Sequence, residues 1–205
     1  MSRQKEAVLY LHGLGGSAQE AAHYRPLFPG ADVTGLDYHG IAPWDAGREI
    51  GEAVLALSER YESVEVIGNS LGAFLAMHAG VGGRIRRAYF ISPVVNMEQL
   101  ILRRMAQDGV TEAALQKQGT AAGSSGWVYS WEYLCRVRAL SDEWRVPTAI
   151  LYGAHDELTP VETIRAFAQA HNASLTVMPD GEHWFHTEEQ MRFLDEWLLK
   201  ERRSR

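Results

Sequence analysis

Short apolar runs alternate with longer segments of helical periodicity along most of the chain. Each run has four to six residues, a length typical of a strand that is buried on both faces. The six runs lie at 7–11, 32–37, 64–67, 88–91, 148–152 and 174–178. The pattern therefore predicts six strands.

The segments between these runs have the spacing and the end signals of helices. Asp45 is expected to be an N-cap residue, and the residues that follow it at helical spacing are Ile50, Val54, Leu57 and Tyr61. Thr159-Pro160-Val161-Glu162 predicts a helix with Pro at its first position and a capping box, and Thr187 predicts the cap of the last helix. Strands that alternate with helices form βαβ units. We therefore expect an α/β fold with a doubly wound, mostly parallel six-stranded sheet and helices on both faces.

One region interrupts this alternation. Residues 94–146 contain helical patterns at Glu98–Gln107, at Thr111–Gln118 and from about Trp131, and the stretch 121–126 consists of small residues typical of a loop. We interpret the chain as a single domain, 1–205, with a helical lid inserted at about 94–146. An insertion at this point follows the carboxyl end of a strand, where ligands bind in sheets of this kind.

The carboxyl end of the third strand carries a candidate nucleophile. Gly68-Asn69-Ser70-Leu71-Gly72 has the form Gly-x-Ser-x-Gly and lies between a predicted strand and a predicted helix. Glycines on both sides allow the sharp turn that exposes a nucleophilic serine above a sheet. The pattern predicts that Ser70 is a nucleophile.

A serine needs a base, and the base needs an orienting carboxylate. Asp156 lies four residues beyond the fifth strand, and His183 lies five residues beyond the sixth. The chain order Ser70, Asp156, His183 is the one expected for a nucleophile of this type. His186 is a second candidate for the base, and Glu157 is a second candidate for the acid.

An acyl transfer also needs donors for the oxyanion. We expect the backbone N–H of Leu71, at the start of a helix, to be one donor. We assign the other to the N–H of Leu14 in the glycine loop His12-Gly13-Leu14-Gly15-Gly16. This loop lacks the pattern of a phosphate-binding loop.

The glycine loop at 12–16 and the serine motif at 68–72, together with Gly153-Ala154-His155-Asp156 and Gly181-Glu182-His183, resemble the α/β-hydrolase superfamily. The chain is most similar to the small bacterial serine hydrolases of the serine aminopeptidase and carboxylesterase type. The resemblance spans almost the whole chain and implies esterase, thioesterase or amidase chemistry. It also implies a compact form of the fold that lacks the first two of eight strands.

Other residues have less specific interpretations. Trp127, Trp131 and Met97 are candidates for a substrate pocket in the insertion, His12 is expected to support the glycine loop, and Cys135 is expected to be buried. The histidines do not have the spacing of a metal site, so we expect neither a metal nor a cofactor.

Composition narrows the class of protein. The net charge of −6 argues against nucleic acid as the main partner, and no apolar run is long enough to span a membrane, so we expect a cytoplasmic protein. The favoured function is the hydrolysis of a small or medium-sized carboxylic ester by a Ser-His-Asp triad. Thioesterase and serine peptidase or amidase activities are alternatives, and a non-catalytic ligand-binding protein is an alternative of another class. The sequence does not reveal the oligomeric state.

Overall fold

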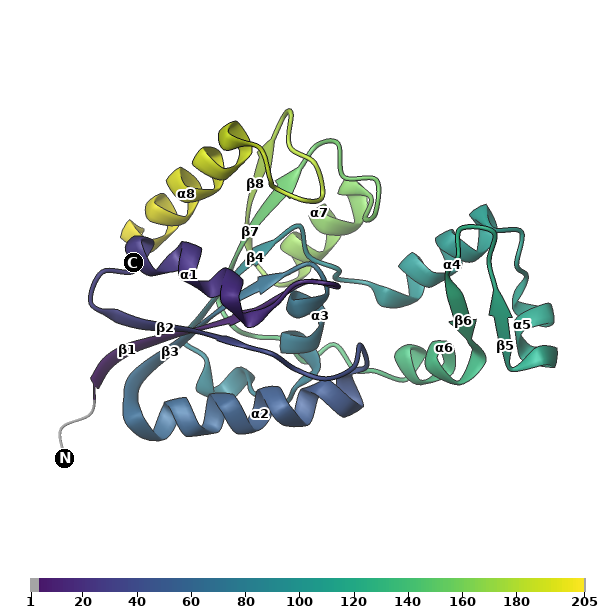
Figure 1. The fold of residues 1–205 in the computed structure, drawn as a ribbon, viewed down its shortest axis with the longest axis horizontal. Coiled ribbons are helices and arrows are strands. Elements are labelled where there is room, and N and C mark those ends of the chain that lie inside the picture. The colour runs from purple at the N-terminus through teal and green to yellow at the C-terminus, as the bar shows by residue number, and fades with distance from the viewer. Residues whose placement is uncertain (1–3, 205) are drawn as a thin grey trace. The chain divides into compact units, whose positions relative to one another are not determined.

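The computed structural model of the chain describes residues 4–204, which form two compact units (Figure 1). We call Met1–Val95 together with Glu143–Arg205 the sheet unit, and Asn96–Asp142 the inserted unit.

A six-stranded sheet forms the centre of the sheet unit. Its strand order is β2-β1-β3-β4-β7-β8, and all five pairings are parallel. The strands are β1 (Gln4–Leu11), β2 (Ala31–Leu36), β3 (Tyr61–Asn69), β4 (Arg87–Ile91), β7 (Thr148–Gly153) and β8 (Ser174–Met178). The predicted six-stranded, mostly parallel sheet and the predicted fold class are confirmed.

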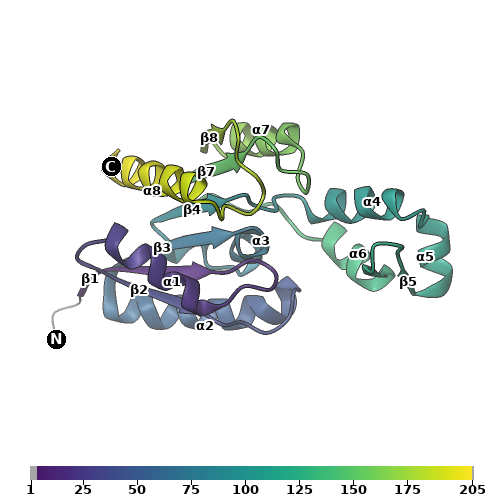
Figure 2. The same cartoon turned by 45° about the horizontal axis from the view of Figure 1, so that its top comes forward.

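Helices cover both faces of this sheet (Figures 1 and 2). One face packs on α1 (Ala21–Tyr24) and α8 (Glu188–Arg203), in a core that contains Tyr10, Ile67, Tyr89, Leu151, Leu194 and Trp197. The other face lies toward α2 (Pro43–Arg60), α3 (Leu71–His78) and α7 (Val161–Ala170). Three short 3-10 helices, Ala18–Glu20, Arg25–Leu27 and Gly82–Arg84, complete the unit.

Two helix starts differ from the prediction. Helix α2 begins at Pro43 with Ala42 as its N-cap, so Asp45 lies in the first turn instead of at the cap. The fixed φ of proline suits the first helical position, which explains the earlier start. The helix ends at Arg60, so the inclusion of Tyr61 was wrong, because this residue begins β3. Helix α7 begins at Val161, one residue later than predicted, because Pro160 has an extended backbone with ψ 142° and is itself the N-cap. The predicted capping box at Thr159 does not form, since no side chain among the described residues caps this helix. The predicted cap at Thr187 is confirmed, since its hydroxyl accepts from the Gln190 N–H.

The inserted unit contains three helices and a small hairpin. The helices are α4 (Met97–Gln107), α5 (Glu112–Gln118) and α6 (Trp131–Arg138), close to their predicted ranges. The prediction of an all-helical insertion was wrong, because β5 (Thr120–Ala122) and β6 (Val128–Ser130) pair as antiparallel strands. Strands of three residues are too short to show an alternation of apolar and polar residues.

Polar side chains hold the inserted unit together. The Asp108 carboxylate accepts hydrogen bonds from the hydroxyls of Ser124, Ser125 and Tyr129 and from the Ser125 N–H, at 2.5–3.0 Å. These bonds lower the pKa of Asp108, the largest effect coming from Tyr129. Arg138 pairs with Glu98 at 2.5 Å and with Glu112 at 2.8 Å, and so connects the three helices.

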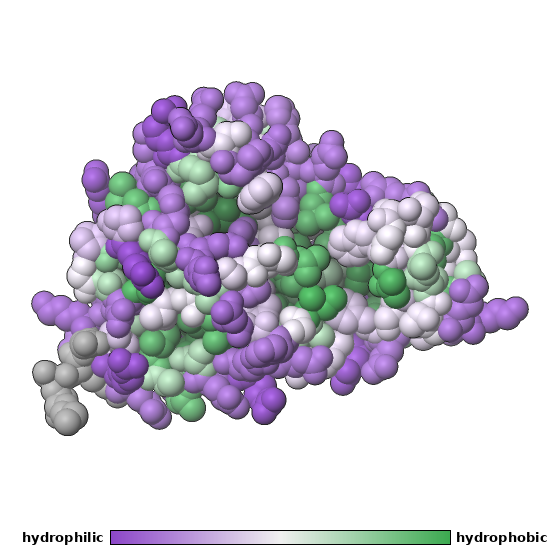
Figure 3. Space-filling view, in the orientation of Figure 1, coloured by the Kyte–Doolittle hydropathy of each residue, from purple (hydrophilic) through white to green (hydrophobic). Residues whose placement is uncertain are grey.

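The surface of the described residues is mixed. The face in Figure 3 is mostly polar, and its apolar atoms form separate patches. Five large apolar side chains are exposed: Leu14, Ile41, Leu55, Val128 and Trp184. Among residues 4–204, no helix is both long and apolar enough to cross a membrane.

Candidate active site

The candidate site lies where the strand order of the sheet changes direction. From β1 the chain crosses to β2 on one side and then to β3 on the other side. Leu11 at the end of β1 is paired with Gly68 near the end of β3, so the segments after both strands leave the sheet side by side. Parallel α/β sheets bind ligands at such a switch point, beyond the carboxyl ends of the strands.

Ser70 occupies a strained turn between β3 and α3. Its backbone has φ 50° and ψ −111°, a left-handed conformation that is costly for a residue with a side chain. The Ser70 N–H donates to the Ile91 carbonyl on β4 at 2.9 Å, which fixes the turn against the neighbouring strand. A Cβ at Gly72 would lie 2.2 Å from the Leu11 carbonyl oxygen, so the helix reaches this position only with glycine there.

The structure brings Ser70, His183 and Asp156 into one hydrogen-bonded chain. Ser70 Oγ lies 2.9 Å from His183 Nε2, and His183 Nδ1 lies 2.7 Å from Asp156 Oδ2. The three side chains come from the ends of β3, β8 and β7, and 113 sequence positions separate the serine from the histidine. This is the order and the contact pattern of a nucleophile, a base and an orienting acid.

The Asp156 carboxylate is fully buried and has a partner for each oxygen. Its Oδ1 accepts from the N–H groups of Leu158 at 2.7 Å and Thr159 at 3.1 Å, and its Oδ2 faces His183. Hydrogen bonds from the backbone favour the ionised carboxylate and fix its orientation. The His183 side chain is 26% exposed, so its ring is accessible from the solvent side.

Two glycines bring the acid and the base together. A Cβ at Gly153 would lie 2.5 Å from the carbonyl carbon of Gly181 and from the Glu182 oxygen, so the loops after β7 and β8 touch through their backbones. The His155 N–H also donates to the Gly181 carbonyl at 2.8 Å. The buried Gln190 side chain accepts from the His186 N–H at 3.1 Å and so ties the His183 loop to α8.

One expected oxyanion donor directly follows Ser70 in the chain, and the other is next to a glycine that packs on Ser70. Leu71 is the first residue of α3, and its N–H therefore has no partner within the helix. Leu14 follows Gly13, where an added Cβ would lie 3.3 Å from Ser70 Cβ. Among the described residues, the Leu14 N–H donates no backbone hydrogen bond.

The competing assignments can now be compared with the structure. His186 bonds to the Trp184 carbonyl at 2.8 Å, whereas His183 contacts Ser70. The ring of His12 stacks on that of Tyr38 at 4.3 Å, and the Tyr38 hydroxyl donates to the His12 carbonyl at 2.5 Å. This contact agrees with a supporting role for His12.

Residues of the inserted unit have no demonstrated place in the site. Met97 is buried and Trp127 and Trp131 are half-buried within the chain, and their assignment to a substrate pocket stays a prediction. The expectation for Cys135 was wrong, because this thiol is exposed. It lies in α6, whose buried positions are Leu134 and Val137, so Cys135 is on the exposed side of the helix.

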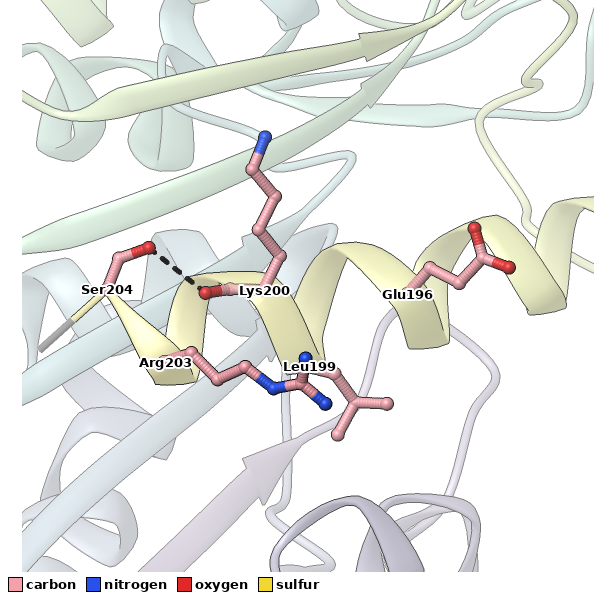
Figure 4. Close-up of a pocket in the computed structure, with 5 residues that line it drawn as sticks. All are labelled: Glu196, Leu199, Lys200, Arg203 and Ser204. Atoms are coloured by element: carbon pink, nitrogen blue, oxygen red, sulfur yellow. Dashed lines mark hydrogen bonds between the residues drawn. The ribbon is translucent and has the colours of Figure 1, made fainter.

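Two other possible sites do not match the triad. Among residues 4–204, no group of three His, Cys, Asp or Glu side chains is arranged to hold a metal ion. A shallow pocket on α8 is lined by Glu196, Leu199, Lys200, Arg203 and Ser204 (Figure 4). This pocket contains no histidine and none of the triad residues.

Sequence reasoning missed the residues that support the triad. The turn Asp156-Glu157-Leu158-Thr159, in which a carboxylate accepts from the N–H groups two and three residues further along the chain, is a pattern that sequence can suggest. No sequence signal identified Gln190 or Tyr38, because each is linked to the site only through the fold.

Comparison with known proteins completes the description. No family model matches the chain, and no curated protein sequence matches it. Among solved structures, Est1E from Butyrivibrio proteoclasticus with bound ferulic acid is similar over 98% of this chain and 90% of its own, with a TM-score of 0.77 and 17% identity. The chain has the α/β-hydrolase fold.

Other α/β-hydrolase structures agree with this assignment. Alpha/beta hydrolase domain-containing protein 10 from mouse matches over 97% of this chain and 90% of its own, with a TM-score of 0.72 and 14% identity. The thioesterase domain from the curacin biosynthetic pathway matches over 97% and 92%, with a TM-score of 0.61 and 18% identity. These identities are low, so the likeness concerns the α/β-hydrolase fold and its order of elements.

Proposed function

We propose that this protein is a serine hydrolase that cleaves carboxylic esters through an acyl-enzyme. The hydrogen-bonded chain from Ser70 through His183 to Asp156 carries this proposal. The geometry suits proton transfer, since the base lies within hydrogen-bond reach of the group that it activates.

Each triad member has a separate role in this proposal. With its Nδ1–H directed at Asp156, His183 leaves Nε2 to accept the Ser70 proton as the serine attacks the ester carbonyl. The buried Asp156 carboxylate then stabilises the imidazolium. His183 protonates the departing alcohol, and in the second half of the cycle it removes a proton from the water that hydrolyses the acyl-enzyme.

The negative oxygen of the tetrahedral intermediate is stabilised by the N–H groups of Leu71 and Leu14 in this scheme. Both belong to segments that flank Ser70, and the Leu71 amide is also at the positive end of the α3 dipole. Such donors require no reorganisation when the charge forms, which is the source of their effect on rate.

A moderately apolar ester suits the surroundings of the triad. Leu14, in the loop beside Ser70, is 69% exposed, and Trp184, next to His183, is 71% exposed. Exposed apolar side chains at a reactive site favour an apolar group on the ligand. The likeness to Est1E, described with bound ferulic acid, supports an acid of small or medium size.

The carboxylates of the inserted unit give no support to an aminopeptidase. A peptidase that recognises a free amino group needs an available carboxylate. Here Glu98 and Glu112 pair with Arg138, and Asp108 is occupied by hydroxyl and amide donors. Glu132 pairs with Arg136, and Asp142 also has a partner, as does Glu143 at the start of the next segment of the sheet unit. Esterase chemistry is therefore favoured over this alternative.

Hydrolysis of p-nitrophenyl esters tests the proposal. We expect the wild-type protein to cleave short-chain esters and Ser70→Ala to lose activity by a factor of about 10⁴ or more, because the nucleophile is absent. A chain-length series, a thioester and an amino-acid amide would rank the substrate classes. Retained turnover by folded Ser70→Ala would contradict the assignment, and a wild type inactive on every substrate would favour a ligand-binding role.

A further inference from the structure

We propose that Glu20 is a positioning residue that acts with Tyr10 to hold the oxyanion loop, Gly13–Ser17, in register with the turn that carries Ser70. The inference rests on the proposed function, and it concerns side chains that do not touch the substrate. Glu20 lies in the 3-10 helix after the loop, and Tyr10 lies on β1 before it.

The Glu20 carboxylate links the far end of the loop to the sheet. One oxygen, Oε1, accepts from the Ser17 N–H at 3.0 Å, and the other, Oε2, accepts from the Tyr10 hydroxyl at 2.5 Å. Hydrogen bonds to a charged acceptor are stronger than those between neutral groups. One side chain therefore fixes the loop end against β1.

The loop also packs directly on this carboxylate. A Cβ at Gly16 would lie 2.6 Å from Glu20 Oε1 and 3.0 Å from His12 Cβ, so the backbone at Gly16 is enclosed between the two side chains. The Gly16 N–H donates to the Gly13 carbonyl at 3.1 Å and closes a turn. Leu14, the proposed oxyanion donor, is inside this turn, and its orientation depends on the two ends that Glu20 and β1 hold.

Tyr10 connects the loop to the nucleophile turn. Its side chain is 1% exposed, and its ring stacks on Tyr24 at 5.1 Å. Burial raises the pKa of Tyr10, so the hydroxyl keeps its proton and donates to Glu20. Tyr10 is paired with Ile67 on β3, and the Asn69 side chain lies close to the loop, with its Nδ2 3.8 Å from a Cβ placed at Gly13. Since β3 leads directly into the turn that carries Ser70, the chain Tyr10–Glu20–Ser17 connects the loop to the strand pair that positions the nucleophile turn.

A comparable pair elsewhere in the sheet provides a control. The hydroxyl of Tyr61, the first residue of β3, donates a hydrogen bond to Asp32 near the start of β2. A tyrosine and a carboxylate therefore also pair at the amino ends of the strands, away from the carboxyl ends that carry the candidate site. Loss of this hydroxyl removes a similar bond far from the proposed oxyanion site. An effect of Tyr10→Phe that Tyr61→Phe does not share therefore belongs to the loop.

The test compares Glu20→Gln, Tyr10→Phe and Tyr61→Phe in ester hydrolysis and in thermal unfolding. An amide in place of Glu20 cannot accept from both donors at once. A shift of the loop by about 1 Å can weaken the binding of the transition state enough to lower the rate up to about 100-fold. We expect kcat to fall about 10- to 100-fold in Glu20→Gln with KM changed less than about twofold, a smaller fall in Tyr10→Phe, and wild-type kcat in Tyr61→Phe.

A second measurement separates positioning from general stability. Phenylboronic acid forms a tetrahedral adduct with an active serine, and one of its oxygens takes the place of the oxyanion. We expect its inhibition constant to rise in Glu20→Gln by a factor similar to the fall in kcat/KM, and the double variant with Tyr10→Phe to lose less than the product of the single losses.

The outcomes distinguish the two proposals. If the wild type shows no hydrolysis, the proposed function fails. If the wild type is active and folded Glu20→Gln keeps its kcat and its affinity for the boronic acid, the positioning role of Glu20 is wrong while the triad stands. Equal losses of kcat in Tyr10→Phe and Tyr61→Phe would also overturn the role of this network.

Discussion

Different kinds of interaction stabilise the sheet unit and the inserted unit internally. In the sheet unit, parallel strands and close backbone contacts at Gly72, Gly153 and Gly181 set the positions of the reactive side chains. In the inserted unit, two charged residues organise the chain, Asp108 by gathering the hairpin and Arg138 by joining three helices. The first arrangement fixes atoms through the backbone, and the second depends on individual polar side chains.

This difference explains why the candidate site lies in the sheet unit. A triad requires its members within about 0.5 Å of the productive geometry, and rigid strand ends can supply that accuracy. Contacts between exposed side chains contribute little each and are screened by salt. We therefore expect changes in the sheet unit to alter activity strongly, and changes in the inserted unit to act first on stability.

The largest effect is expected from Asp156→Asn. An asparagine keeps the shape of the side chain, but it cannot orient His183 with Nδ1–H directed at a carboxylate or stabilise the imidazolium. We expect kcat for p-nitrophenyl acetate to fall about 10⁴-fold while the circular dichroism spectrum is unchanged. The matched control is Asp180→Asn, which alters an exposed carboxylate near the His183 loop, and activity within about threefold of wild type is expected there. Similar losses in both variants would contradict a specific role for Asp156.

An intermediate effect is expected from Gly153→Ala. The added Cβ cannot fit 2.5 Å from the Gly181 carbonyl carbon, so the loops that carry Asp156 and His183 must separate. We expect a loss of stability of about 1–3 kcal/mol in urea unfolding and a fall in kcat of at least about tenfold. Gly83→Ala is the control, because a Cβ there has no heavy atom within 4 Å. An active Gly153→Ala protein of wild-type stability would show that the close backbone contact is dispensable.

The smallest effect is expected from Asp108→Asn. The pKa of Asp108 lies below its usual value in the folded protein, so its bonds stabilise the inserted unit above the unfolded pKa of about 3.9. That stabilisation is lost as the pH falls through the folded pKa. We expect hydrogen exchange in the hairpin to be faster in Asp108→Asn at pH 7, and the difference from wild type to shrink below about pH 4.

Glu52→Gln, an exposed change on α2, is the control for this pH effect and should leave exchange in the hairpin unchanged. An equal difference between wild type and Asp108→Asn at pH 7 and at pH 3 would show that the charge of Asp108 does not hold the hairpin.

The features that the sequence could predict lie mainly in the sheet unit, and several that it could not predict depend on contacts between side chains of separate segments. Apolar runs and glycine-bounded turns indicated all six strands and the residues Ser70, Asp156 and His183, because repeated periodicity and chain order leave a local signal. The start of α7 was predicted one residue early. The Thr159 N–H donates to the Asp156 carboxylate, so this residue belongs to the Asp156 turn and the helix begins only at Val161. The hairpin, Asp108, Gln190 and Glu20 were not found, because their contacts join segments that sequence spacing does not bring together.

Labelling with a fluorophosphonate probe tests the central claim most directly. The probe reacts with serines activated by a neighbouring base, and peptide mapping by mass spectrometry identifies the modified residue. The account predicts a single label on Ser70 in the wild-type protein, and none in Ser70→Ala or after unfolding. A folded wild-type protein that takes no label, or that takes it on a different serine, would contradict the assignment of Ser70 as an activated nucleophile.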